Sequence, residues 1–138
     1  MPNFTLLDKS NYLKGLLIIA RKDNQLADSE KEILKKISDK LGFASTFFEE
    51  TLQNLLINEH ITEEPIKFSN KEIACSFISD GLKLAFSDKK IHEPEIEWLK
   101  SVCVENDIDL SWFNIQYKHY KDSLNISVEN NLSLYSII

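Results

Sequence analysis

The chain has 138 residues, the size of one domain, and its three glycines and three prolines are too few for a sandwich or barrel that turns roughly every ten residues. Leu, Ile, Lys and Glu are abundant and favour helices, so the composition indicates an all-α protein. The formal net charge is −6, so docking to a phosphate backbone would begin with repulsion, which argues against nucleic acid as a partner.

Apolar residues recur at helical spacing along most of the chain, and capping residues mark where helices begin and end. Asp8 or Ser10 can cap the first helix, and Gly42 can end the second in a left-handed conformation. Ser69 and Glu72 spell a capping box ahead of the fourth. The predicted helices cover about 10–22, 29–41, a stretch from about 45, 70–86, a stretch from 94, and 111–122.

The fourth helix is predicted to run through the middle of the bundle, because its apolar residues fall on two faces and Gly81 allows a neighbour to approach closely. The fifth opens at Pro94, whose fixed φ suits the first helical position, and buries Leu99, Val102 and Cys103. The tail 126–138 forms either a short seventh helix or an extended segment, so the expected fold is a compact bundle of six or seven helices.

Cys75 and Cys103 lie in apolar helical patterns and lack CxxC spacing, so we expect two reduced, buried thiols. The amino-terminal region lacks a basic segment and a cleavage site, and charges flank its apolar run from Leu16 to Ala20. No export signal and no membrane span are therefore expected, and the chain is interpreted as a cytoplasmic protein forming one domain over 1–138.

One stretch of the sequence occurs twice, since Asp23 falls on Asp88 at a separation of 88 − 23 = 65 residues. Each copy places an acid where one helix ends, an apolar residue in the connection, and a second acid where the next helix starts. The doubled stretch predicts two similar helical-hairpin halves packed into one bundle. The repeated residues are Asp23, Leu26 and Glu30 in the first copy and Asp88, Ile91 and Glu95 in the second.

Each copy also contains residues with an expected structural role. Asp28 and Glu93 are predicted to cap the second helix of each pair, and Leu26 and Ile91 to point inward as plugs. The second acid of each copy falls in the first helical turn, where the helix dipole favours negative charge.

The first acid of each copy faces the negative end of its helix dipole, which costs about 0.3–1 kcal/mol unless something compensates. Asp23 and Asp88 either accept hydrogen bonds from nearby amides or share a divalent cation with Glu30 and Glu95. The spacing excludes an EF-hand, which needs Gly where Asp28 stands. The candidate metal ligands are Asp23, Glu30, Asp88 and Glu95.

In each copy a helix with a trailing Ala is followed by an Asp, an apolar residue, a Glu and an amphipathic helix. This doubled order resembles the TerB-like (tellurite-resistance protein B) family, over about Tyr12 to Tyr120. The resemblance implies an all-helical fold of two related halves, an intracellular role in bacterial stress responses, and metal-binding acids that map onto the four candidate ligands. The family usually has Gly after each Asp, where this chain has Asn24 and Lys89.

No strained nucleophile turn, phosphate-binding loop or zinc-protease motif occurs in the sequence, so no enzyme activity is predicted. Phe47 adjoins Phe48, and Trp112 adjoins Phe113, and neighbours on a helix point about 100° apart. One residue of each pair is therefore expected at the surface, with Phe47 and Trp112 as the candidates for contact with a protein partner or a second copy.

These features together predict a non-enzymatic, acidic helical binding or adaptor domain of TerB-like type in a bacterial stress or defence response. The alternative is a sensor that holds a divalent cation in its acidic inter-helix loops.

Overall fold

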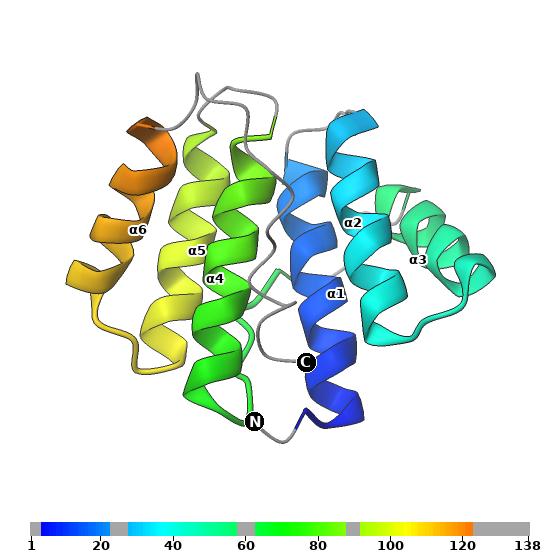
Figure 1. Cartoon of the computed structure of the whole chain (residues 1–138), viewed down its shortest axis with the longest axis horizontal. Helices are drawn as coiled ribbons and strands as arrows, with labels where there is room; N and C mark the ends of the chain where they lie inside the picture. The colour runs from blue at the N-terminus through cyan, green and yellow to red at the C-terminus, as the bar shows by residue number, and fades with distance from the viewer. Residues whose placement is uncertain (1–3, 23–27, 58–62, 88–91, 123–138) are drawn as a thin grey trace.

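The computed structural model describes residues 4–22, 28–57, 63–87 and 92–122, and these residues form six helices and no strand. The all-α bundle is therefore confirmed, and the tail 126–138 lies outside the described residues. Figure 1 shows α1 and α4 side by side in the centre, with α2 and α3 beyond α1, and α5 and α6 beyond α4. The helices are α1 (Leu6–Lys22), α2 (Asp28–Leu41), α3 (Ser45–Ile57), α4 (Lys71–Ala85), α5 (Glu93–Glu105) and α6 (Leu110–Asp122).

Helix α1 begins at Leu6, earlier than predicted, because Thr5 and Asp8 form a capping box. Thr5 Oγ1 accepts a hydrogen bond from the Asp8 N–H at 3.0 Å, and Asp8 Oδ2 accepts one from the Thr5 N–H at 3.3 Å. The prediction that Asp8 or Ser10 is the cap is therefore wrong. Thr5 is the cap, and Asp8 is its partner inside the first turn.

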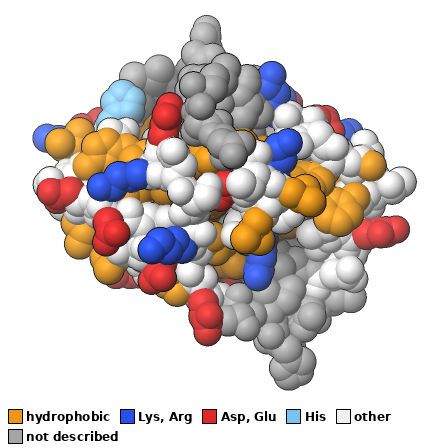
Figure 2. Space-filling view, turned by 90° about the horizontal axis from the view of Figure 1, so that it is seen from below, with side chains coloured by type: hydrophobic (Ala, Val, Ile, Leu, Met, Phe, Trp, Pro, Cys, Tyr) orange, Lys and Arg blue, Asp and Glu red, His pale blue; other side chains and the backbone are white. Residues whose placement is uncertain are grey.

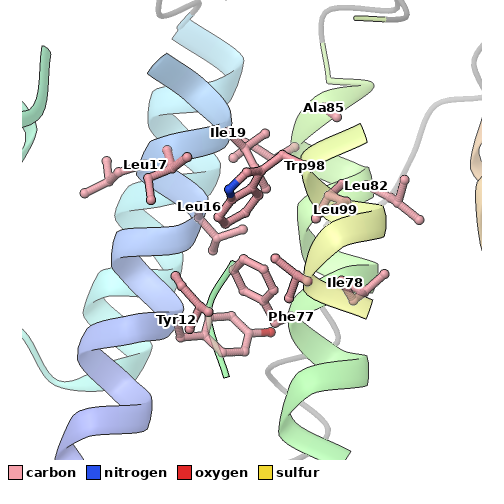
Figure 3. Packing of buried hydrophobic residues seen from close by; sticks show 14 of the residues in the cluster. Tyr12, Leu16, Leu17, Ile19, Phe77, Ile78, Leu82, Ala85, Trp98 and Leu99 are labelled. Atoms are coloured by element: carbon pink, nitrogen blue, oxygen red, sulfur yellow. The ribbon is translucent and has the colours of Figure 1, made fainter. Parts of the chain in front are cut away.

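Helix α4 is the central helix, as predicted, with eleven of its fifteen residues buried. Gly81 is required by close packing, because a Cβ there would lie 2.8 Å from Leu99 Cδ2 and 3.0 Å from Ile19 Cδ1. Figure 3 shows the apolar side chains of α1, α4 and α5 meeting in this region. All six helices contribute buried residues to this single core.

The cap of α4 differs from the predicted one. Asn70 is the N-cap residue, and its side-chain oxygen accepts a hydrogen bond from the Glu72 N–H at 2.7 Å. Ser69 instead donates from Oγ to Asp8 Oδ2 at 2.5 Å and from its N–H to Asp8 Oδ1 at 3.0 Å. The capping box of Ser69 with Glu72 is therefore wrong, because the buried Asp8 carboxylate takes the Ser69 hydroxyl.

Helix α2 ends at Gly42 as predicted, with a φ of +89°. The Gly42 N–H donates to the Asp39 carbonyl and the Phe43 N–H to the Ser38 carbonyl, both at 3.0 Å. This pair of bonds is the Schellman arrangement, which satisfies two of the last carbonyls of the helix.

Helix α5 ends in the same arrangement without a glycine. Asp107 has a φ of 56°, and its N–H donates to the Val104 carbonyl at 3.2 Å. The Ile108 N–H donates to the Cys103 carbonyl at 2.9 Å. Asp107 therefore occupies the left-handed position that Gly42 occupies at the end of α2.

Side chains from α5 and its C-cap form hydrogen bonds with the segment that leads into α4. Trp98 donates from Nε1 to the Glu63 carbonyl at 2.9 Å. Asn106 donates from Nδ2 to the Ile66 carbonyl at 2.7 Å and accepts from the Phe68 N–H at 2.8 Å. These bonds satisfy backbone groups of the segment that would otherwise be buried without partners.

The starts of the last three helices repeat the spacing of the starts of the first three. The first residues of α4, α5 and α6 follow those of α1, α2 and α3 by 65 residues, since 71 − 6, 93 − 28 and 110 − 45 are all 65. The helices α1, α2 and α3 all contact one another, and so do α4, α5 and α6. This offset equals that of the doubled sequence stretch, but the two similar helical-hairpin halves stay a prediction.

Candidate functional site

The second acids of the two copies lie in equivalent and enclosed positions. Glu30 is in the first turn of α2 and 2% exposed, and Glu95 is in the first turn of α5 and 1% exposed. A carboxylate buried to this degree needs compensating contacts, and both side chains make contacts within the protein. Their predicted partners Asp23 and Asp88, and the plugs Leu26 and Ile91, lie outside the described residues.

Asp28 and Glu93, the predicted caps of these two helices, are both the first residue of a helix. The N-cap of α5 is His92, whose carbonyl accepts from the N–H groups of Glu95 and Ile96 at 3.0 and 3.2 Å. Glu93 is therefore the first helical residue, and its assignment as the cap is wrong. In the first copy, α2 begins at Asp28 itself, so that residue is helical. Both side chains are exposed.

A complete metal site is not assembled in the described parts of the chain. Among 4–22, 28–57, 63–87 and 92–122, no group of three or more His, Cys, Asp or Glu side chains could hold a metal ion. The predicted set includes Asp23 and Asp88, which are outside those ranges. The cation site therefore stays a prediction, with Glu30 and Glu95 as its described members.

A buried acid that the sequence reasoning missed lies in the centre of the bundle. Asp80 of α4 is fully buried, and the Tyr12 hydroxyl of α1 donates to its Oδ2 at 2.5 Å. Ser76 Oγ lies 2.9 Å from the same hydroxyl. The sequence did contain one indication of a buried acid, because Asp80 is the only acid among residues 73–87, in the most buried helix.

The Asp80 carboxylate influences titratable groups on three helices. Burial and then the Asp80 charge raise the pKa of Tyr12 well above its ordinary value, and the same two causes raise the pKa of Tyr120 on α6. Burial lowers the pKa of Lys83 on α4, while Asp80 acts in the opposite direction. Lys83 Nζ lies 5.9 Å from the centroid of the Tyr120 ring. Two phenols and one ammonium group are therefore close enough to Asp80 to be influenced by its charge.

The two aromatic pairs differ in exposure. Phe47 is 47% exposed while Phe48 is buried, and the Phe47 ring stacks on Phe43 with centroids 5.2 Å apart. Trp112 is half-buried and packs against the core, while Phe113 is fully buried. The candidate surface residue is therefore clearly exposed in the first pair and only partly exposed in the second.

Exposed apolar residues and exposed acids lie at the end of α5, in the connection to α6 and on α6. Val104, Leu110 and Ile115 are 63%, 41% and 65% exposed. Residues 101–117 contain no Lys or Arg. Figure 2 shows hydrophobic side chains interspersed with acidic and basic ones on the left of the lower end, the side on which α5 and α6 lie. We call this surface the α5–α6 corner; it consists of Val104, Leu110 and Ile115 with the exposed acids Glu105, Asp107 and Asp109.

The two cysteines are free thiols with suppressed reactivity. Cys103 is fully buried, and burial raises its pKa to about 12. Cys75 is only half-buried, unlike its prediction, and burial also raises its pKa. Both thiols are therefore almost entirely protonated near neutral pH, and the thiolate is the reactive form.

Comparison of the chain with protein-family models, curated proteins and solved structures found no match. The resemblance to the TerB-like family therefore stays a prediction that rests on the residues of the doubled stretch. No helix in the part of the chain that the structure describes is both long and apolar enough to cross a membrane.

Proposed function

We propose that this chain is a non-enzymatic, acidic helical binding module of TerB-like type that acts in the cytoplasm in a bacterial stress or defence response. The observation that carries the binding role is the α5–α6 corner, where three large apolar side chains are exposed among three carboxylates. Exposed apolar groups gathered within one polar rim are typical of protein-binding surfaces.

The chemistry of this corner favours a partner with a basic, amphipathic segment. Val104 and Leu110 bracket the connection between the two helices and offer apolar area whose burial favours association by about 25 cal/mol per Å². Glu105, Asp107 and Asp109 supply negative charge on the same connection. Lys or Arg residues flanking an apolar anchor would complement both features and speed association.

A second copy of this chain fits the corner less well. Self-association through the same surface would bring Glu105, Asp107 and Asp109 close to the same three acids of the other copy. The chain as a whole carries a formal charge of −6, which adds to the repulsion. A heterologous basic partner is therefore favoured over a homodimer at this site.

The binding role is tested with a variant that keeps the core intact. The exposed side chains of Val104 and Ile115 are replaced together by Ser, and Leu7→Ser, an exposed position at the start of α1, is the matched control. A partner captured by the wild type is identified by mass spectrometry and its affinity is measured by calorimetry. The corner variant should lose at least tenfold in affinity, and the control should lose less than twofold. Equal affinities would refute this surface, and a self-associating wild type would replace the basic partner with a homodimer.

A second function, cation sensing, is favoured by the enclosure of Glu30 and Glu95 at equivalent corners of the bundle. In this alternative each glutamate shares a divalent cation with Asp23 or Asp88, and oxygen ligands of this kind suit calcium. A bound cation would raise the melting temperature by mass action.

The cation proposal is tested by thermal melting with calcium, magnesium, manganese and zinc at millimolar concentration. Calcium or another of these ions should raise the melting temperature of the wild type, and Asp23→Asn combined with Glu30→Gln should abolish the rise. Asp28→Asn, at an exposed acid of the same helix start, should retain it. No response to any of the four ions would exclude the cation sensor and leave the binding module unaffected.

A further inference from the structure

Two neighbouring leucines at the start of α1 are exposed to solvent. Leu6 and Leu7 are 73% and 69% exposed, the highest values for any large apolar side chain that the structure describes. From Tyr12 to Ala20 the helix is buried apart from Lys14, so its exposed apolar surface is confined to the first turn. Side chains with this exposure bury little area, and the fold therefore gains little from them.

The corresponding positions in the second half of the chain are charged. The first two residues of α4 are Lys71 and Glu72, and they follow Leu6 and Leu7 by 65 residues, since 71 − 6 and 72 − 7 are both 65. Both of these side chains are exposed as well. A helix start in this bundle therefore does not require apolar residues at these positions. An exposed pair of leucines that the fold does not need is typical of a surface that a partner covers.

The exposed side of this first part of α1 carries positive charge and no negative charge. Between Thr5 and Lys14 the only acid is Asp8, which is buried and accepts hydrogen bonds from Ser69, whereas Lys9 is half-exposed and Lys14 exposed. Neither lysine makes an ion pair with any residue that the structure describes. The chain as a whole has a formal charge of −6, so this part of α1 is a local exception.

Helix geometry places the lysines beside the leucines. Lys9 follows Leu6 by three residues and is its neighbour on the helix, and Lys14 follows Leu7 by seven residues and shares its face. Figure 2 shows hydrophobic side chains beside basic ones near the middle of the lower end, where α1 begins. We call this surface the α1 patch; it consists of Leu6, Leu7, Lys9 and Lys14.

The size and charge of the α1 patch limit what it can bind. An amphipathic helix binds lipid through an apolar face much larger than two leucines, and the acids of the α5–α6 corner at the same end of the bundle would repel an anionic lipid surface. A symmetric contact with a second copy would bring Lys9 and Lys14 close to the same two lysines. A protein segment with apolar anchors flanked by Asp or Glu complements both the leucines and the lysines.

We propose that the α1 patch is a second docking surface, which binds an acidic segment of a partner protein through apolar anchors. Leu6 and Leu7 supply the apolar contact, and Lys9 and Lys14 select for negative charge. The α5–α6 corner has the opposite charge, so the two surfaces recognise different partners. This inference goes beyond the proposed function and does not depend on the corner.

The α1 patch is tested with two fluorescent synthetic amphipathic helices that carry Leu on one face and either Glu or Lys on the other. The wild-type chain should bind the Glu helix, and Leu6→Gln combined with Leu7→Gln should weaken that binding at least tenfold by fluorescence polarisation. Lys9→Glu combined with Lys14→Glu should weaken it to a similar degree. Added salt should weaken binding by the wild type, because it screens the attraction between the lysines and the glutamates.

Two matched variants should bind the Glu helix within twofold of the wild type. Lys31→Glu combined with Lys35→Glu makes the same change of charge at exposed positions of α2. Val104→Ser combined with Ile115→Ser alters the α5–α6 corner alone. Binding of the Lys helix should show the reverse sensitivity, with loss in the corner variant only. Failure of the α1 patch and failure of the corner are therefore distinguishable.

Three results would overturn the proposal. The first is that the wild type binds the Glu helix no more tightly than a helix with Ser in place of Leu, or that the double leucine variant binds it as the wild type does. The second is binding to phosphatidylglycerol vesicles that the leucine variant loses, which would replace the acidic segment with a membrane surface. The third is self-association by light scattering that the same variant abolishes, which would replace it with a second copy.

Discussion

Asp107 holds a backbone conformation that glycine adopts more easily. Its φ of 56° lies in the left-handed region, where a side chain crowds the following carbonyl. Gly42 holds the same position at the end of α2 with a φ of +89°, and no atom lies within 4 Å of a Cβ built there. The cost of a side chain at the end of α2 would therefore be conformational and not a matter of packing.

Asp107→Gly is expected to raise the free energy of unfolding by about 0.5–1 kcal/mol, because it removes the left-handed strain and leaves both hydrogen bonds of the helix end in place. Urea unfolding at pH 7 measures the change. Gly42→Ala is the matched control and should lower the free energy of unfolding by about 1 kcal/mol. A lower stability in Asp107→Gly would show that the Asp107 side chain contributes more than its backbone conformation costs.

Ser38 and Ser76 are two buried serines with opposite hydrogen bonding. Among the described residues, Ser38 Oγ on α2 has no hydrogen-bond partner, whereas Ser76 Oγ bonds the Tyr12 hydroxyl. Ser38→Ala should raise the free energy of unfolding by about 0.5–1 kcal/mol, since it removes an unsatisfied hydroxyl and favours the helix. Ser76→Ala should lower it by about 1 kcal/mol. Chemical denaturation compares them, and a loss of stability in Ser38→Ala would contradict the interpretation.

At the scale of the elements, Asp8 connects the start of α1 to Ser69, two residues before α4. Its carboxylate accepts hydrogen bonds from Thr5 and from both the N–H and the hydroxyl of Ser69. Burial by itself raises the pKa of Asp8, but the hydrogen bonds from Ser69 and Thr5 outweigh burial and lower it. The charged form therefore holds the two helix starts together.

This connection predicts an acid-sensitive stability. The pKa of Asp8 is lower in the folded chain than its value of about 3.9 in an unfolded chain. The stability that it contributes is therefore fully present above pH 4 and is lost as the pH falls through the folded pKa. Asp8→Asn should cost about 1–3 kcal/mol at pH 7, and the difference from the wild type should shrink below pH 4. Denaturation curves from pH 7 to pH 2.5 test this, and parallel profiles would contradict it.

The helices themselves were largely predictable from local sequence, while the residues that cap their N-termini were not. The apolar spacing around Leu99 and Val102 and the Gly42 stop depend on neighbours within a few residues, so one sequence suffices to predict them. The Ser69 hydroxyl, the predicted cap of α4, instead donates to Asp8, which is 61 residues away. The sequence alone does not show which of two possible partners such a hydroxyl binds, because that depends on which one the fold brings close to it.

At the scale of the whole molecule, features that rest on a local sequence pattern were predicted, and features that depend on long-range packing were missed. The doubled acids were visible because the sequence repeats itself, and Glu30 and Glu95 lie at equivalent helix starts. The Tyr12–Asp80 bond joins residues 68 apart and leaves no local pattern. The α5–α6 corner was missed because helical spacing does not show which apolar residues stay uncovered after the helices pack.

The central claim is that the α5–α6 corner binds a basic partner, and site-specific photo-crosslinking tests it most directly. A photoreactive phenylalanine derivative is placed at Val104 or at Ile115 in the cell that makes the protein, with the exposed Glu32 of α2 as the control position. We predict one cross-linked partner at both corner positions, none at position 32, and loss of the product when Glu105 and Asp109 are changed to Lys. Absence of any product at the corner, or the same products at position 32, would contradict the claim.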